Sequence, residues 1–507
     1  MSGVGVEKMC AGSKTVNASL VGGERLVRAV KGRIVGDFKA DSICFTSVTT
    51  DSRTVCKDAL FVPLIGENQD GHAYIPQGIE KGADVIFVCR ANYEKDVALY
   101  EKLAAEHGGV AFIVVENTLH ALQDAAAAYV EQFPRLIKCA VTGSSGKTTT
   151  KEIAVALLSQ KYRVISNKGN LNSETGLPLS VFEIRPEHEL GLFEMGMNRT
   201  NEIGEIVAVL KPNYGIVTNI GTAHIGILGS RQAIAEEKKK IFTYTDKNGV
   251  AVIPAADDFA NFLAEGVAGK IIRYGKDARE NGVVFLHDDG LDGTTFSVDG
   301  VEMRLRLPGA YNFSNALGAV ALARELGLTP EQIKAGIESV RPLGARSHLI
   351  RAENGLAILE DCYNANPDSM GKAVEFCSDL QVGGKKLFVL GDMLELGEQS
   401  AAAHRTIGEM VSESGADGVI FVGEEMRAAF EVVRAKKASG EIAMATVEHV
   451  AAHDDEAIKG VAEKVRALAH AGDFVLLKGS NGIGLNRLVP ILTGSCAASA
   501  SAGEVAR

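Results

Sequence analysis

The chain has 507 residues, which at roughly 100–200 residues per domain predicts about three domains. Hydrophobic residues make up 46 % and charged residues 23 %, a composition typical of folded proteins that excludes wholesale disorder. The formal net charge of −11 argues against broad nucleic-acid binding, which requires a basic surface.

Cysteine spacing and hydropathy indicate in which cellular compartment the protein is expected. The eight cysteines include no Cys-x-x-Cys pair, which argues against a zinc ribbon or a thioredoxin-like site. The N-terminus lacks the apolar stretch of a signal peptide, and no apolar run is long enough to span a bilayer. We therefore expect a cytoplasmic protein without membrane insertion.

In the first half of the chain, the pattern of apolar residues changes near residue 136. Residues 24–133 mix short apolar runs with turns and end in an alanine-rich amphipathic helix at 117–133, stopped by Pro134. Beyond it, strands are predicted at 136–141, 162–166, 190–195 and 214–219, and helices at 147–160, 174–183, 202–210 and 232–244. These repeated units predict a mostly parallel sheet with helices on both faces.

The second half contains a further α/β region. The apolar period shortens to about two between residues 283 and 307, which predicts antiparallel ribbons, and a helix follows at 312–326. Beyond residue 344, strands are predicted at 356–360, 386–390, 418–422 and 474–477, with helices between them. The fold class is therefore α/β with more than one sheet.

The segment 142–150, TGSSGKTTT, follows an apolar strand and opens a helix. Its glycines allow backbone N–H groups to surround phosphate oxygens, and the helix N-terminus adds a positive dipole end. In this interpretation Lys147 reaches the β- and γ-phosphates and the Thr148 hydroxyl binds Mg²⁺. Val141 stands where the usual phosphate loop has its first glycine, so Gly143 supplies a shorter loop. The alternative is a Gly-Ser turn that only caps the helix.

Polar residues follow the next two strands. Glu194 ends the strand 190–195, and His224 comes after the strand 214–219. The carboxyl ends of strands are where open α/β sheets place their ligands, so both residues are candidate metal ligands. The charged run 236–240 is typical of a solvated helix face with ion pairs. Alternatively, a lysine of this run near a metal could carry a carbamate and act as a carboxylate.

The chain resembles the Mur ligases, the peptide-adding enzymes of peptidoglycan synthesis. The strings that carry the resemblance lie in all three parts of the chain. They are TDSR at 50–53, ALFVPL at 59–64, DGHAYIP at 70–76, TGSSGKT at 142–148, FEMGMN at 193–198, TAH at 222–224, DCYNANP at 361–367, GDMLELG at 391–397 and LKGS at 477–480.

The resemblance implies three domains. These are a small N-terminal α/β domain at 1–134 that binds a UDP-sugar, a central P-loop domain at 135–342 with a parallel sheet that binds ATP, and a C-terminal Rossmann-like domain at 343–507. Within the family, KGNLN at 168–172, YNANP at 363–367 and DMLELG at 392–397 favour the member that adds D-alanyl-D-alanine.

The implied reaction is an ATP-dependent amide ligation. ATP phosphorylates the terminal carboxylate of UDP-N-acetylmuramoyl-tripeptide, and the amine of D-alanyl-D-alanine then displaces phosphate. The family also implies two Mg²⁺ ions and a carbamoylated lysine. The partners are thus small molecules, without nucleic acid, and we expect a monomer.

The resemblance also assigns residues. Lys147, Glu194, His224 and Lys238 are the implied catalytic set, with Thr148, Glu194, His224 and the Lys238 carbamate as metal ligands. Lys239 and Lys240 adjoin Lys238, so the register of the carbamate stays open. The implied nucleotide-binding residues are Gly143, Ser144, Ser145, Gly146, Lys147, Thr148, Thr149, Asn315, Arg346 and Asp361. The implied sugar- and peptide-binding residues are Asp51, Ser52, Arg53, His72, Asn170 and Asn172.

Four alternatives stay open. A related ligase would add diaminopimelate or lysine instead of the dipeptide. A folylpolyglutamate synthase should lack the Asp-Ser-Arg and Asp-Gly-His strings found at 51–53 and 70–72. A nucleotide-binding homologue could have kept the fold and lost catalysis, although Lys147, Glu194, His224 and Lys238 are all retained. A transport or motor ATPase would need an Asp-ended apolar strand after the loop, which the sequence lacks.

Overall fold

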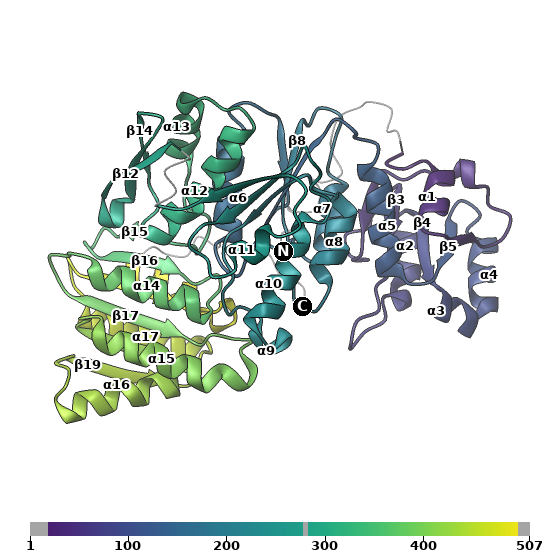
Figure 1. Ribbon diagram of the computed structural model, residues 1–507. Coiled ribbons are helices and arrows are strands. Elements are labelled where there is room, and N and C mark those ends of the chain that lie inside the picture. The colour runs from purple at the N-terminus through teal and green to yellow at the C-terminus, as the bar shows by residue number, and fades with distance from the viewer. Residues whose placement is uncertain (1–18, 277–281, 495–507) are drawn as a thin grey trace. The chain divides into compact units, whose positions relative to one another are not determined.

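The computed structural model describes residues 19–276 and 282–494 (Figure 1). The ends of the first and third implied domains, including Cys10 and Cys496, lie outside these ranges. Contacts divide the chain into two compact units, described separately below. The first comprises Met1–Ala140, Tyr162–Gly215 and Lys240–Gly249, and the second comprises Val141–Lys161, Ile216–Lys239 and Val250–Arg507.

The N-terminal part of the first unit is a five-stranded sheet of order β1-β5-β4-β3-β2. All neighbours are parallel except β1 and β5. Strands β4 and β5 are almost fully buried, so their continuous apolar runs suit an interior sheet. The strands are β1 (Arg33–Ile34), β2 (Ser47–Thr49), β3 (Ala59–Phe61), β4 (Ala83–Cys89) and β5 (Ala111–Val115), and the helices are α1 (Gly23–Ala29), η1 (Ala40–Ser42), η2 (Gly71–Tyr74), α2 (Ile75–Glu80), α3 (Arg90–Lys95), α4 (Val97–Glu106) and α5 (Thr118–Val130).

The central six-stranded sheet has the order β11-β10-β9-β6-β8-β7, and the chain passes from one unit to the other within β6 and within β9. Helices α6 and α12 pack on each other in the second unit. The elements of this region are β6 (Ile137–Thr142), α6 (Lys147–Leu158), β7 (Val164–Ser166), α7 (Gly176–Val181), β8 (Leu190–Glu194), α8 (Glu202–Leu210), β9 (Tyr214–Val217), α9 (Ile225–Leu228), α10 (Arg231–Lys239), η3 (Lys240–Phe242), β10 (Val250–Pro254), α11 (Ala260–Ala264), β11 (Lys270–Tyr274) and α12 (Ala310–Glu325).

A small antiparallel sheet of order β12-β13-β14 precedes α12 in the second unit. Its central strand is buried along its whole length, whereas β12 alternates between half-buried and exposed residues. The elements are β12 (Val283–Asp288), η5 (Gly290–Asp292), β13 (Thr294–Val298), β14 (Val301–Leu305) and, beyond α12, α13 (Pro330–Ser339).

The C-terminal sheet has the order β15-β16-β20-β17-β18-β19, parallel except for the edge strand β15 (Figure 1). Alternate side chains of its strands enter two separate cores. Phe388 and Leu390 pack with helices α14, α15 and α16, whereas Leu387 and Val389 pack with α17 and α18. The elements are β15 (His348–Arg351), β16 (Ala357–Asp361), α14 (Pro367–Asp379), β17 (Lys386–Gly391), η6 (Gly397–Gln399), α15 (Ser400–Glu413), β18 (Gly418–Val422), α16 (Arg427–Ser439), β19 (Thr446–Val450), α17 (Asp455–Leu468), β20 (Phe474–Lys478), η7 (Asn481–Ile483), η8 (Leu485–Arg487) and α18 (Leu488–Thr493).

The structure confirms the predicted α/β class and the helices and strands expected between residues 117 and 477, most within a few residues at each end. The helix predicted at 232–244 instead divides into α10 and the 3₁₀ turn η3 at Lys239. Strands β10, β11, β15 and β19 were not predicted. Within the described ranges, no helix is both long and apolar enough to cross a bilayer.

Candidate active site

The phosphate-loop segment forms a tight turn between β6 and α6. Gly146 has φ +77° and caps α6 at its N-terminus, and the chain enters the helix at Lys147. The Lys147 ammonium donates to the carbonyl of Gly143 at 3.0 Å, so the side chain folds back over the loop. Thr148 is buried in the first turn of the helix. The first N–H groups of α6, which have no partner within a helix, therefore face the turn as an anion site.

The segment after β9 supports the loop from one side. Asn219 accepts from the N–H of Ser144 through its carbonyl at 3.0 Å and from that of Ser145 through its side chain at 3.1 Å. The Thr218 hydroxyl donates to the carbonyl of Ser145 at 2.6 Å. These bonds fix the shape of the loop without any ligand, so a phosphate meets a site that is already formed.

Two glycines of the loop are required by their surroundings. A Cβ on Gly143 would lie 1.7 Å from the Thr218 hydroxyl, and one on Gly146 would lie 2.3 Å from Oδ1 of Asn315. The amide of Asn315, on α12, donates to Oδ1 of Asn312 at 3.3 Å. The structure thus brings Asn315 against the N-terminus of α6, as its assignment to the nucleotide requires.

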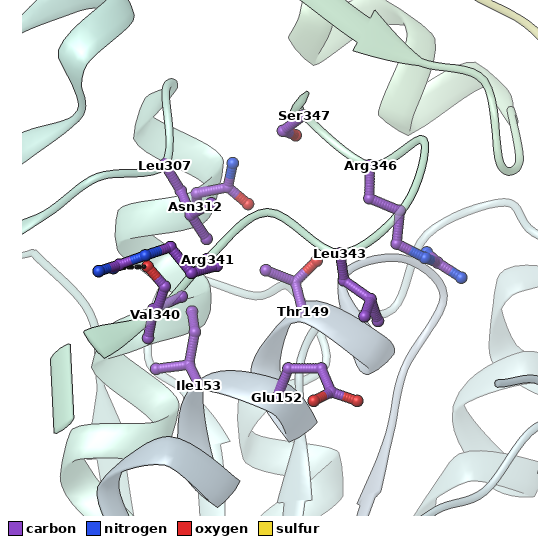
Figure 2. Close-up of a pocket in the computed structure, with 10 residues that line it drawn as sticks. All are labelled: Thr149, Glu152, Ile153, Leu307, Asn312, Val340, Arg341, Leu343, Arg346 and Ser347. Atoms are coloured by element: carbon purple, nitrogen blue, oxygen red, sulfur yellow. Dashed lines mark hydrogen bonds between the residues drawn. The ribbon is translucent and has the colours of Figure 1, made fainter. Parts of the chain in front are cut away.

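A pocket opens beside α6 in the second unit (Figure 2). Its lining combines the outer face of α6 with the connection that precedes β15. Figure 2 shows Thr149 and Leu343 side by side at its centre, with Glu152 and Ile153 below them. The lining residues are Thr149, Glu152, Ile153, Leu307, Asn312, Val340, Arg341, Leu343, Arg346 and Ser347. Predicted residues Thr149 and Arg346 therefore share one pocket.

The third-domain residues assigned to the nucleotide lie in a bonded cluster. The Arg346 guanidinium stacks on the Tyr363 ring, 3.8 Å from its centroid. Asp361, at the end of β16, accepts from the N–H of Ser347 at 3.3 Å and from the ammonium of Lys478 at 2.5 Å. Ser347 itself has φ +46°, an uncommon conformation for a residue with a side chain.

His224 follows Thr218 and Asn219, which support the phosphate loop, by six and five residues, and it caps α9 with φ +64°. Burial, together with the nearby ammonium groups of Lys147 and Lys238, lowers the pKa of its imidazole to about 3. The ring is therefore neutral at physiological pH and able to bind a metal. Its Nδ1 is buried and has no hydrogen-bond partner among the described residues, and Oε2 of Glu395 lies 3.6 Å away.

The three neighbouring lysines have different surroundings. Lys238 is completely buried, at 0 % exposure. The Lys239 ammonium lies over the Phe262 ring, 4.3 Å from its centroid, and that of Lys240 donates to Asn201 at 2.9 Å. Lys238 is thus the buried lysine of the run, and it lies close enough to His224 to influence its pKa.

Glu194 lies in the first unit and is buried at the end of β8. The amide of Asn172 donates to its Oε1 at 2.7 Å, and Asn167 bonds both the N–H and the C=O of Glu194. Its Oε2 is buried with no hydrogen-bond partner in the described part of the chain. A buried carboxylate oxygen of this kind calls for a cation or a proton. Asn170 is exposed on the same loop.

The loop carrying Asn172 is tied to α8 by a buried carboxylate that sequence reasoning missed. Glu202, 2 % exposed, accepts from the N–H of Glu174 at 3.0 Å and from that of Asn198 at 2.5 Å. Arg199 bridges Glu174 and Glu205 on the outside of the same loop. The only signal in the sequence is an acid in the first turn of a helix, which is common in surface helices.

The residues assigned to the UDP-sugar lie in the N-terminal part of the first unit. Arg53 pairs with Asp51 through both carboxylate oxygens, and its hydrogen bonds lower the pKa of Asp51. Ser52 is buried and donates to Gln77 at 2.6 Å. His72 is buried, with Nδ1 2.6 Å from Asp70 and Nε2 accepting from the N–H of Cys89 at 2.9 Å. Asp51 and Arg53 are therefore open to a ligand, whereas Ser52 and His72 are used inside the domain.

The candidate metal ligands can be compared with the coordination that Mg²⁺ prefers. Among the residues that the structure describes, no group of three or more His, Cys, Asp or Glu side chains could hold a metal ion. Mg²⁺ is usually held by one or two protein ligands with phosphate oxygens and water. Thr148 and His224 in the second unit, and the unpartnered carboxylate oxygen of Glu194 in the first, fit that mode of binding.

A link between the central region and α14 was also missed. Asp368, in the first turn of α14, accepts from the N–H of Thr222 at 2.7 Å and from its hydroxyl at 2.8 Å. A Cβ on Gly221 would lie 2.3 Å from the same carboxylate. The segment that carries His224 is thus bonded directly to the third domain, a contact that no local sequence signal reveals.

Comparison with known proteins defines the class. Three family models match in order, the Mur ligase family catalytic domain at 45–130, the Mur ligase middle domain at 141–323 and the Mur ligase glutamate ligase domain at 345–481. The chain belongs to the Mur ligase family, and its architecture is that family's three-domain α/β fold.

Individual relatives are similar over nearly the whole length. A UDP-N-acetylmuramoyl-tripeptide–D-alanyl-D-alanine ligase of Treponema pallidum is 40 % identical over 92 % of this chain and 98 % of its own. The structure is similar to MurF from Acinetobacter baumannii, with a TM-score of 0.80 and 27 % identity over 94 % of this chain and all of that one. It is also similar to MurF ligase from Thermotoga maritima in complex with ADP, with a TM-score of 0.73 and 26 % identity over 90 % of this chain and 99 % of that one.

Proposed function

We propose that this chain is the ligase that joins D-alanyl-D-alanine to UDP-N-acetylmuramoyl-tripeptide, at the expense of ATP, in the synthesis of peptidoglycan precursors. The observation that carries the proposal is the 40 % identity to a ligase of that name over almost the full length of both chains. The preformed phosphate loop and the retained Lys147, Glu194, His224 and Lys238 support an active enzyme. They argue against a homologue that only binds nucleotide.

ATP binds with its phosphates at the N-terminus of α6. The N–H groups of the first turn and the Lys147 ammonium hold the β- and γ-phosphates, which frees Lys147 from its contact with Gly143. The adenosine extends along α6 towards the pocket of Figure 2, with Asn315 near the base. Arg346 and Asp361 reach the phosphates and the ribose from the third domain.

Two Mg²⁺ ions accompany the nucleotide in this proposal. Their proposed protein ligands are Thr148, Glu194, His224 and a carbamate on Lys238. When bound, Mg²⁺ neutralises phosphate charge and so lets an anionic carboxylate approach. Lys238 is completely buried, and its ammonium and that of Lys147 both act on the imidazole of His224. These surroundings favour Lys238 over Lys239 and Lys240, because a carbamate there offsets positive charge.

The chemistry proceeds in two transfers. A carboxylate oxygen of the tripeptide attacks the γ-phosphorus and ADP leaves, which gives an acyl phosphate. The neutral amine of the dipeptide then attacks the acyl carbon, inorganic phosphate leaves, and the amide forms with release of the extra amine proton. Lys147 stabilises the charge on the transferring phosphoryl group. Asn170 and Asn172 orient the tripeptide beside Glu194.

The N-terminal domain anchors the UDP-sugar through Asp51 and Arg53, supported by the buried Ser52 and His72. The third domain closes the nucleotide site and excludes water from the acyl phosphate, which would otherwise hydrolyse. The proposed domain boundaries lie near residues 134 and 342. We expect the protein to be cytoplasmic, since ATP and UDP-linked substrates are both found in the cytoplasm. We also expect it to be a monomer.

The decisive experiment is reconstitution with omission of each substrate. Purified protein is given ATP, Mg²⁺, UDP-N-acetylmuramoyl-tripeptide and D-alanyl-D-alanine, and the pentapeptide product is measured by mass together with released phosphate. We expect product only when every component is present. Phosphate release that does not depend on the dipeptide, or the absence of pentapeptide, would contradict the proposal.

The same assay separates the alternatives. A diaminopimelate- or lysine-adding ligase would use a UDP-linked dipeptide and a single amino acid in place of the two substrates above. A catalytically silent homologue would bind ADP without forming any product. Running the tripeptide substrate with lysine and with diaminopimelate at its third position would also define which of the two this enzyme prefers.

A further inference from the structure

We infer that Glu395, on the turn that follows β17, is a positioning residue for His224. Its carboxylate holds the proton on Nδ1 of the imidazole, so that the lone pair of Nε2 is available to a metal. The inference rests on the proposed function, in which His224 binds Mg²⁺. Metal-binding histidines usually donate their second N–H to a carboxylate or a carbonyl, which fixes the ring and its tautomer.

The first observation is the contact itself. Oε2 of Glu395 lies 3.6 Å from Nδ1 of His224, slightly beyond hydrogen-bond distance. That Nδ1 is buried and makes no hydrogen bond within the described ranges. A carboxylate beside one ring nitrogen favours the tautomer protonated there. A small closing movement of the turn would complete the hydrogen bond.

The second observation is that the backbones of the two segments are in contact. Gly226, two residues after His224, faces the turn so closely that a Cβ would lie 3.2 Å from the carbonyl oxygen of Glu395 and 3.1 Å from the carbonyl carbon of Leu396. The approach of Glu395 to His224 therefore does not depend on the chance meeting of two flexible side chains. It follows from how the turn packs on α9.

The third observation is the way the turn is held. Beyond the end of β17, the N–H of Asp392 still bonds the carbonyl of Val422 at the end of β18 at 3.1 Å, and the next two N–H groups bond side chains from other elements. Nε2 of the fully buried His404 accepts from the N–H of Met393 at 3.0 Å, while Nδ1 of His404 donates to the carbonyl of Ser400 at 2.8 Å. The Ser480 hydroxyl accepts from the N–H of Leu394 at 3.0 Å.

The backbone of Glu395 is strained in a way that core packing does not explain. Its φ is +65°, in the left-handed region that residues with a side chain seldom adopt, yet its side chain is 64 % exposed. Such strained conformations persist where the surroundings fix them, and they gather at functional sites. Here an exposed carboxylate lies near the buried Nδ1 of a partly buried imidazole.

The test measures metal binding without turnover. Mn²⁺ is used as the probe and is titrated into the full-length protein with ADP and inorganic phosphate, with free Mn²⁺ followed by electron paramagnetic resonance. We expect Glu395→Ala to weaken Mn²⁺ binding about 10- to 100-fold, the usual effect of losing such a partner. Glu395→Gln, whose amide oxygen still accepts from Nδ1, should recover part of that loss.

Two matched variants serve as controls. Glu398→Ala removes an exposed carboxylate three residues further along the chain, and this variant should bind Mn²⁺ like the unmodified protein. His224→Ala should weaken binding at least as much as Glu395→Ala. In the His224→Ala background, the further change Glu395→Ala should have no added effect, because Glu395 acts through the imidazole.

The outcomes distinguish the inference from the proposed function. If His224→Ala weakens Mn²⁺ binding and Glu395→Ala does not, the role of Glu395 is wrong and the metal site stands. If the two effects are independent, Glu395 does not act through His224 and the inference is likewise overturned. If His224→Ala leaves Mn²⁺ binding unchanged, the proposed metal ligand and the inference fail together.

Discussion

The ammonium of Lys478 lies 2.5 Å from Oδ2 of Asp361, where two adjacent parallel strands end side by side. Lys478 is 1 % exposed, so its charge is removed from water and depends on this one carboxylate. Asp361 is the residue proposed to reach the ribose of ATP, and Lys478 determines where its carboxylate points. The pair joins the stability of the third domain to its contact with nucleotide.

Removing Lys478 should therefore cost both stability and nucleotide affinity. Lys478→Met leaves the Asp361 carboxylate without its partner, a change that typically costs about 3–5 kcal/mol when a buried pair is broken. Calorimetric melting measures the stability and isothermal titration measures ADP affinity. The double variant Lys478→Met/Asp361→Asn should melt higher than Lys478→Met alone, and equal melting temperatures would contradict the reasoning.

A substitution in the phosphate loop tests whether the shape of the loop matters for nucleotide binding. Gly146→Ala places a methyl group 2.3 Å from Oδ1 of Asn315, and we expect ADP affinity to fall at least tenfold, or by about 1.4 kcal/mol. Gly300→Ala is the matched control, because Gly300 also has a positive φ, +85°, but has no atom within 4 Å of its added Cβ. It should cost about 1–2 kcal/mol of stability and leave ADP affinity unchanged. Equal affinities for the two variants would show that the clash is unimportant.

The two lysines at the end of α10, Lys238 and Lys239, should differ sharply in their effect on turnover. Lys238→Ala removes the side chain that would carry the carbamate, so turnover should be lost, and a short-chain carboxylic acid such as acetate should restore part of it. Lys239→Ala loses a contact with the Phe262 ring and should keep most of the activity. Mass spectrometry of peptides stabilised against CO₂ loss measures the modification directly. Acetate rescue of Lys239→Ala and not of Lys238→Ala would move the carbamate by one position.

The buried carboxylate of Glu202 should support the tripeptide-binding loop. Glu202→Gln replaces one of its two acceptors by a donor that faces an N–H group, which costs about 1–3 kcal/mol in an unsatisfied buried pair. The loop that carries Asn172 then loosens, so KM for the UDP-linked tripeptide should rise while KM for ATP stays constant. Glu205→Gln, which disturbs only the partly exposed Arg199 contact, should change neither constant appreciably. A similar rise in both KM values would contradict this role, because it would indicate a general loss of structure and not a local effect on the tripeptide-binding loop.

The Asp51–Arg53 pair gives a pH dependence of known sign. Hydrogen bonds from Arg53 lower the pKa of Asp51 in the folded chain, so the pair stabilises the fold above the ordinary pKa of an aspartate. That contribution is lost as the pH falls through the lowered value. Both side chains are partly exposed, so we expect only about 0.2–1 kcal/mol. Arg53→Met should lower the melting temperature at pH 7 and leave it unchanged near pH 2, and a constant difference would contradict the assignment.

Local sequence patterns predicted the elements that carry the site. The helix at 202–210 agrees with α8 at both ends, and the apolar strand before residue 142 agrees with β6 within one residue. Edge strands such as β15 and β19 were missed because their half-buried residues show neither a continuous apolar run nor a clear alternation. Helix 232–244 was predicted too long because its pattern continues through the 3₁₀ turn at Lys240.

Some residues of the candidate site could be predicted from the sequence and others could not. Lys147, Glu194 and His224 follow apolar strands and could be proposed from position alone. Asp368 and Glu395 could not, because each acts on a residue more than a hundred positions earlier in the chain. The spacing of residues in the sequence predicts which side chains lie at the end of a strand. It does not predict which distant turn packs against that end.

The short segment from Thr218 to His224 sets a length constraint on the whole enzyme. It supports the phosphate loop at its beginning, bonds Asp368 of α14 in its middle and presents an imidazole at its end. A single inserted or deleted residue within the segment would displace at least one of these three contacts. Natural variation in this family should therefore exchange side chains within the segment and preserve its length. The same backbone, four peptide bonds from Thr218 to Thr222, connects Ser145 of the phosphate loop with Asp368 of α14.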